Sequence, residues 1–121
     1  MSKRTLILGA SANSERYAFK ATTMLSEHGH DVFPVGLRAG KIGEQNILTD
    51  FPKIKNIDTI SLYVGPKNQP VYYDYILNVI TPKRIIFNPG TESEKLVNLA
   101  GKKGIQTEEA CTLVLLSLGS Y

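Results

Sequence analysis

Small and polar residues at positions 9–14 follow a short apolar run and form the segment of this sequence best suited to bind an anion. Backbone can approach a ligand closely where side chains are small, and amides at the start of a helix favour phosphate or diphosphate. We expect Arg16 to add a charged contact to the same group. The predicted contacts in this segment are Gly9, Ala10, Ser11, Ala12, Asn13 and Arg16. The pattern is not G-x-G-x-x-G, and the alternative is a plain strand-to-helix turn.

Two cations, Arg38 and Lys41, follow the second predicted strand. A domain that binds NAD usually carries Asp or Glu at the end of that strand, where the carboxylate accepts from the ribose hydroxyls. Here no acid follows until Glu44. Cations at this place suit a phosphorylated ribose, either the 2′-phosphate of NADP or the 3′-phosphate of coenzyme A. The alternative is that both are solvated loop charges.

Other residues that could do chemistry are poorly placed for it. Cys111 lies in an apolar run without a nearby His and is interpreted as a small core residue. His28 and His30 flank a predicted helix end and lack a third metal ligand. No nucleophile stands beside a base, and no Walker lysine is present. We therefore predict no catalytic residue and no metal site, and favour a binding role over an enzyme, without excluding activity.

Strands and helices alternate along the predicted chain. Strands are expected at 5–8, 31–35, 58–64, 84–87 and 105–107. Helices are expected from Asn13 or Ser14 as cap to residue 28, near 49–52, and at 71–80, 93–103 and 112–118. In the first helix, the residues expected to face the core are Tyr17, Ala21, Met24, Leu25 and His28. This order predicts an α/β, three-layer Rossmann-like fold whose five-stranded parallel sheet has helices on both faces, with the ligand outside the carboxyl ends of the strands.

Composition fits one globular domain over residues 1–121 and excludes several classes of protein. One cysteine is too few for a disulfide framework or a multi-cysteine zinc site. The net charge of +3, without a dense basic run, gives no reason to expect nucleic-acid binding. No long apolar segment predicts a membrane span, and a cytoplasmic protein is expected.

With these loops, the chain resembles the family of small stand-alone CoA-binding domains, a Rossmann-like module also found at the start of the succinyl-CoA synthetase alpha subunit. The resemblance covers residues 5–118 and rests on the segments 8–11 with Asn13 and Arg16, 29–35, 43–44, 57–60 and 100–105. Cys111 falls where many members carry a cysteine. The chain departs from the family at Gly36-Leu37, where many members have Asn-Pro, and at Asn88, where many carry Gln.

The resemblance implies a binder of coenzyme A or acyl-CoA without chemistry of its own. It implies that residues 11–16 hold the diphosphate. Pro34, Val35 and the loop from Arg38 to Lys41 would surround the 3′-phosphate end, and Val64 and Pro66 would line the path of the pantetheine arm.

Two other functions stay open. One is a sensor or regulatory domain that binds an NAD(P)-type dinucleotide. The other is an interaction domain with a vestigial pocket, in which the apolar segment 113–118 docks a partner. A homodimer or a partner protein is compatible with either, and the sequence does not decide whether an acyl group is carried.

Overall fold

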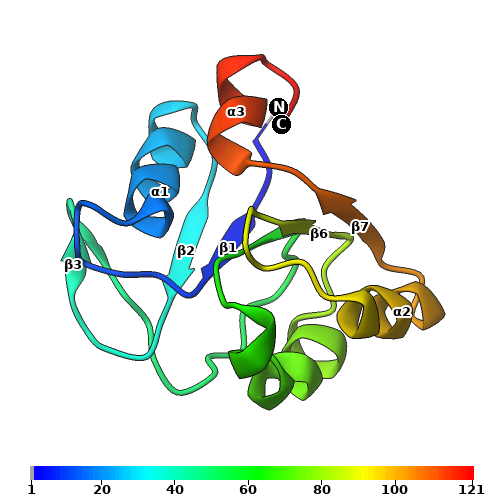
Figure 1. Ribbon diagram of the computed structural model, residues 1–121. Coiled ribbons are helices and arrows are strands. Elements are labelled where there is room, and N and C mark those ends of the chain that lie inside the picture. Colours follow the sequence, from blue (N-terminus) through cyan, green and yellow to red (C-terminus); the bar gives the residue numbers. More distant parts are fainter. Residues whose placement is uncertain (1) are drawn as a thin grey trace.

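Four short, mostly apolar runs and one polar run form a five-stranded parallel sheet in the computed structural model, which describes residues 2–121 (Figure 1). The three central strands are buried on both faces, which explains their nearly continuous apolar sequences. The strand order β2-β1-β5-β6-β7 confirms the predicted fold class. The strands are β1 (Thr5–Leu8), β2 (Val32–Val35), β5 (Thr59–Leu62), β6 (Arg84–Phe87) and β7 (Gln106–Glu109).

Helices cover both faces of this sheet and give the three predicted layers (Figure 1). On one face, α1 (Tyr17–Glu27) and α3 (Thr112–Ser117) pack around Ile7. On the other face lies α2 (Glu94–Lys102), together with three short segments whose helical turns are tighter or wider than those of an α-helix. These segments are η1 (Pro66–Asn68), η2 (Pro70–Tyr72) and η3 (Tyr75–Ile80). The chain changes face between β1 and β5, which are neighbours in the sheet. Such a switch point opens a crevice at the carboxyl ends of the strands.

The first helix differs from its prediction at both ends. Arg16 is its N-cap residue and makes no side-chain cap, so capping by Asn13 or Ser14 is wrong. Tyr17 and His28 face solvent instead of the core. The buried stripe is made of small residues and one leucine, which let the helix pack closely on the sheet: Ala18, Ala21, Thr22 and Leu25.

The apolar segment 71–80 forms two kinds of helix in place of the predicted α-helix. η2 is a 3-10 turn that starts at Pro70, and η3 is π-helical, with the amide of Thr81 donating to the carbonyl of Ile76 at 2.9 Å. The wider turn rotates the stripe, so Tyr72, Tyr75 and Ile76 are buried while Val71 and Val79 are exposed. Most of the predicted apolar face still packs on the sheet.

The region after β2 was the least predictable part of the chain. A small hairpin, β3 (Lys41–Ile42) and β4 (Gln45–Asn46), lies where a loop was expected. No helix forms near residue 50, because Asp50 and Phe51 both have left-handed backbone, with φ of 63° and 54°. The Phe51 ring instead packs on Tyr72 and Tyr75, with centroids 5.5 and 5.4 Å away.

Candidate functional site

An open cleft of about 1160 Å³ lies over the carboxyl ends of the sheet, at the predicted place. Its walls come from the loops after β1, β2, β5 and β6 and from the first turn of α1. Figure 1 shows these segments meeting between α1 and the helical turns that follow β5. The lining residues are residues 9–13, 16–18, 37–39, 63–65, 67, 68, 70–72 and 89.

The loop after β1 is held against its neighbours by its first two amides. Gly9 and Ala10 both donate to the carbonyl of Val35 at 2.9 Å, which ties this loop to the end of β2. Gly9 has φ +98°, and a Cβ on it would lie 2.9 Å from the carbonyl oxygen of Tyr63. Only glycine fits here without strain, because the left-handed backbone and the close approach both disfavour a side chain.

The rest of this loop leaves amides free at the cleft. The side chains of Ser11 and Asn13 accept from the amides of Asn13 and Glu15 at 3.1 and 3.0 Å, which shapes the turn. In the described residues, the amides of Ser11, Ala12 and Ser14 donate to no other group. Free amides beside the N-terminus of an eleven-residue helix form a good environment for phosphate oxygens.

Three cations line the cleft, and none of the described lining residues is a carboxylate. Arg16 lies at the N-terminus of α1, Arg38 in the loop after β2 and Lys67 on η1. Sequence reasoning proposed the first two and missed Lys67. Its signal was available, since a lysine directly after Gly65-Pro66 stands where the chain leaves a central strand. The charge of the cleft favours an anionic ligand.

Four of the residues proposed from sequence lie outside the cleft lining. Pro34 is buried in β2, and Val35 is 3 % exposed, so Val35 acts through its carbonyl on the β1 loop. Lys41 is exposed on the β3 hairpin, paired in register with Asn46. Pro66 is exposed between Gly65 and Lys67, which do line the cleft. The lining includes the other eight: Gly9, Ala10, Ser11, Ala12, Asn13, Arg16, Arg38 and Val64.

The departure at Gly36 has a clear physical reason. A Cβ on this residue would lie 2.4 Å from the carbonyl oxygen of Ala10, so the β1 loop occupies the space that a side chain would need. The next residue, Leu37, is 86 % exposed and lines the cleft. The end of β2 therefore presents an apolar side chain and then the charge of Arg38.

A buried polar network lies behind the cleft. Asn88 is 1 % exposed, and its amide nitrogen donates to the Ser61 hydroxyl at 2.9 Å and to the Leu62 carbonyl at 3.0 Å. Its oxygen accepts from the amide of Thr112 at 2.8 Å. Asn88 thus joins β5, β6 and the start of α3. This is a structural role, in which an amide side chain meets both donor and acceptor demands.

Gln69 joins two of the loops that form the cleft wall. It is fully buried, and its amide nitrogen donates to the carbonyls of Val64 at 2.8 Å and Thr91 at 2.6 Å. The loops after β5 and β6 are therefore fixed relative to each other. Sequence reasoning missed this residue, because a glutamine in a short turn carries no recognisable signal.

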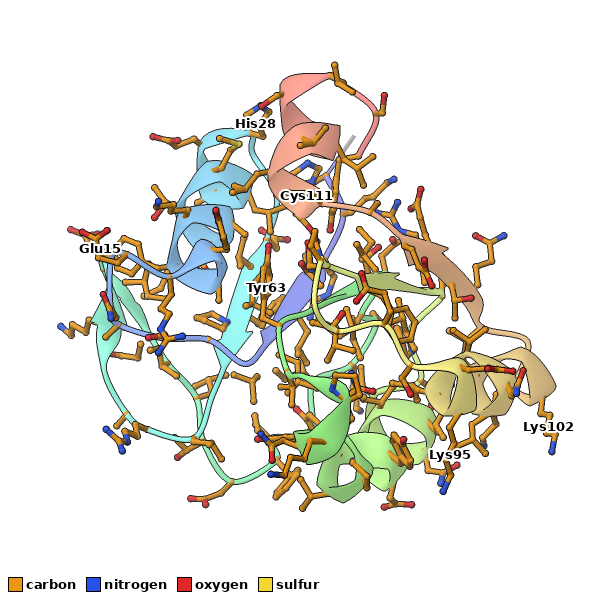
Figure 2. All side chains as sticks on the ribbon, viewed as in Figure 1. Glu15, His28, Tyr63, Lys95, Lys102 and Cys111 are labelled. Atoms are coloured by element: carbon orange, nitrogen blue, oxygen red, sulfur yellow. The ribbon has the colours of Figure 1, made fainter. Side chains whose placement is uncertain are left out.

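The residues named earlier as chemically capable lie away from the cleft lining. Figure 2 shows Cys111 at the start of α3 and His28 at the end of α1. His30 accepts from the Lys3 amide at 2.9 Å, and partial burial lowers its pKa. Across residues 2–121 no three His, Cys, Asp or Glu side chains gather as metal ligands.

Tyr63 is one of the lining residues of the cleft and buries its hydroxyl. Burial raises its pKa to about 12, and the nearby hydroxyls of Ser61 and Thr112 oppose that rise. The phenol is therefore protonated at neutral pH. Figure 2 shows this ring at the centre of the molecule, between α1 and the start of α3.

Comparison with known proteins adds a family to this geometry. A family model described as "CoA binding domain" matches residues 3–117. No curated protein matches the sequence. A solved structure of an uncharacterized protein is 45% identical and has a TM-score of 0.97, covering 100% of this chain and 99% of the other.

Two archaeal structures are similar at lower identity. A conserved hypothetical protein from Pyrococcus furiosus is 25% identical with a TM-score of 0.77, covering 94% of this chain and 98% of that one. A hypothetical protein from Pyrococcus horikoshii is 23% identical with a TM-score of 0.82, covering 93% and 80%. These two share the fold. In addition, the described residues include no helix long and apolar enough to cross a membrane.

Proposed function

Since the chain belongs to the CoA-binding domain family, we propose that it binds coenzyme A in the cleft at the carboxyl ends of the sheet. The observation that carries this proposal is the combination of free loop amides with three cations and no lining carboxylate. Coenzyme A carries a diphosphate and a separate 3′-phosphate, so it needs more than one positively charged region. This cleft offers charge at its α1, β2 and η1 sides.

Each part of the ligand has a proposed place. The free amides of Ser11 and Ala12, with Arg16, hold the diphosphate. Arg38 meets the 3′-phosphate, and the exposed side chain of Leu37 covers the adenine. The pantetheine arm follows the apolar wall formed by Val64 and the segment 70–71. Lys41 does not line the cleft, so Arg38 is the cation that we assign to the 3′-phosphate.

The same cleft does not favour NAD. A dinucleotide with free ribose hydroxyls is usually held by an acid at the end of the second strand, and here that position is Gly36-Leu37. We propose a binding module without a catalytic step, since the described lining side chains include no Asp, Glu, His or Cys. We also propose that it works in the cytoplasm, as one domain, with coenzyme A or acyl-CoA as its small-molecule partner.

Thermal unfolding with separate ligands tests this function. Coenzyme A at about 100 times its dissociation constant should stabilise the fold by about 2.7 kcal/mol. For a chain of this length the melting temperature should rise by about 10 °C. NADP and NAD at equal concentrations are the controls. A rise with NADP but not coenzyme A would support the dinucleotide sensor instead, and no rise with any of them would support a vestigial pocket.

A further inference from the structure

Lys67 and Arg16 stand on opposite sides of the crevice between β1 and β5. Arg16 precedes α1, which packs on the same face of the sheet as α3. Lys67 belongs to η1, which leads into the turns packed on the other face. Both side chains line the same cleft. The crevice at the switch point is therefore flanked by one cation from each outer layer.

No contact that stabilises the fold explains why a lysine stands at position 67. In the described part of the chain the ion pair found is Arg84 with Glu108, so no carboxylate neutralises Lys67. The residue is exposed. A lysine on one wall, facing a cleft that already holds two arginines, adds to the repulsion in the empty protein. Binding of an anion between them removes that repulsion.

The backbone fixes which part of the ligand lies between these cations. Gly9 brings the end of β1 against the Tyr63 carbonyl, so the loops that follow β1 and β5 lie side by side. The free amides of Ser11 and Ala12 come directly after that contact. A phosphate group held by these amides therefore lies beside the β1 loop, which Gly9 places next to the segment that leads from Tyr63 to η1.

We infer that Lys67 is a diphosphate-binding residue, which closes on coenzyme A from the wall opposite Arg16. The inference rests on the proposed function and adds to it one binding residue and an assignment of each cation to one phosphate group. Lys67 and Arg16 hold the diphosphate, and Arg38 alone reads the 3′-phosphate. Removing the charge of Lys67 therefore weakens every ligand with a diphosphate by the same factor.

Calorimetric titration of Lys67→Gln with three ligands tests the assignment. The ligands are coenzyme A, 3′-dephospho-coenzyme A and pantetheine, which has neither phosphate group. Affinity for the first two should fall about two- to fivefold, as for one solvent-accessible charge contact. Affinity for pantetheine should be unchanged. The loss of affinity should be smaller at about 0.5 M salt, well above physiological ionic strength, because salt screens an exposed charge.

Lys102→Gln is the matched control, since it removes the same charge from an exposed site on α2 that points away from the cleft (Figure 2). Lys67→Arg should keep most of the affinity, which excludes misfolding as the cause. If the wild type binds coenzyme A but Lys67→Gln behaves like Lys102→Gln, the inference is wrong while the proposed function stands. A larger loss for coenzyme A than for the dephospho form would move Lys67 to the 3′-phosphate. If the wild type does not bind coenzyme A, both the inference and the proposed function are wrong.

Discussion

Replacing Tyr63 with Phe removes a single oxygen that the fold buries without a partner. No partner of this hydroxyl meets hydrogen-bond geometry in the described structure. The Ser61 and Thr112 hydroxyls are close enough to lower its pKa, but they bond each other at 2.7 Å. Burying a hydroxyl without a bond costs about 1–3 kcal/mol. The ring and its packing are retained in Tyr63→Phe. The free energy of unfolding at pH 7 should therefore rise by about 1 kcal/mol.

The same substitution should flatten the alkaline side of the stability curve. Burial raises the pKa of Tyr63 to about 12, above the value near 10 of an unfolded tyrosine. The folded state thus holds this proton more tightly. The contribution is complete below pH 10 and is lost as the pH rises from about 10 to 12, by about 3 kcal/mol for a two-unit difference. The Tyr63→Phe protein does not lose this stability at high pH. Burial also raises the pKa of Tyr75 to about 12, so the loss of stability that comes from Tyr75 remains in the variant.

Tyr75→Phe is the control with the opposite sign. Its hydroxyl donates to the carbonyl of Pro52 at 2.5 Å, so removing it should lower stability at pH 7 by about 1 kcal/mol. Urea unfolding of the three proteins at pH 7 and at steps from pH 9 to 12 measures both effects, and each kcal/mol corresponds to about 4 °C in melting temperature. A Tyr63→Phe protein less stable than the wild type at pH 7 would refute the reasoning, because the hydroxyl would then have a partner.

Two further predictions concern the cleft. Arg38→Gln should weaken coenzyme A about tenfold and 3′-dephospho-coenzyme A little, as measured by calorimetry; equal losses would take Arg38 away from the 3′-phosphate. Gly9→Ala should cost about 2–4 kcal/mol in urea unfolding, since the new Cβ meets both a φ of +98° and the Tyr63 oxygen at 2.9 Å. Gly90 has φ +92°, but no atom lies within 4 Å of a Cβ built on it. Gly90→Ala should therefore lose only the free energy of the strained backbone, about 1 kcal/mol. Similar losses in Gly9→Ala and Gly90→Ala would mean that the close contact at Gly9 relaxes.

The parts of the fold that sequence predicted well depend on local signals. Each central strand is an apolar run bounded by Gly, Pro or Asn, and the five-stranded parallel sheet follows from its alternation with helices. Ser93 shows the same for a helix start, since it precedes α2 and its hydroxyl accepts from the Leu96 amide at 3.2 Å. These features need only neighbouring residues, so they can be read without the structure.

The errors come from contacts between distant segments. Asp50 and Phe51 adopt left-handed backbone, and the Phe51 ring packs on aromatic residues some twenty positions later. The π-helical turn at Tyr75–Ile80 keeps its buried face by widening, which periodicity alone does not reveal. At the site, the loop after β1 was predicted from its small residues. Lys67 was missed and Lys41 lies on the β3 hairpin outside the cleft lining, because topology decides which wall of a cleft a loop charge reaches.

The first and last residues that the structure describes lie together on the side of the sheet where β1 begins (Figure 1). The Lys3 ammonium donates to the Tyr121 carbonyl, and the Tyr121 phenol bonds Thr5 at 2.5 Å. The cleft opens over the opposite edge, where the strands finish. An affinity tag, a fluorescent reporter or a surface tether joined at either end is thus held away from the entrance, so immobilised protein keeps its binding face toward the solvent.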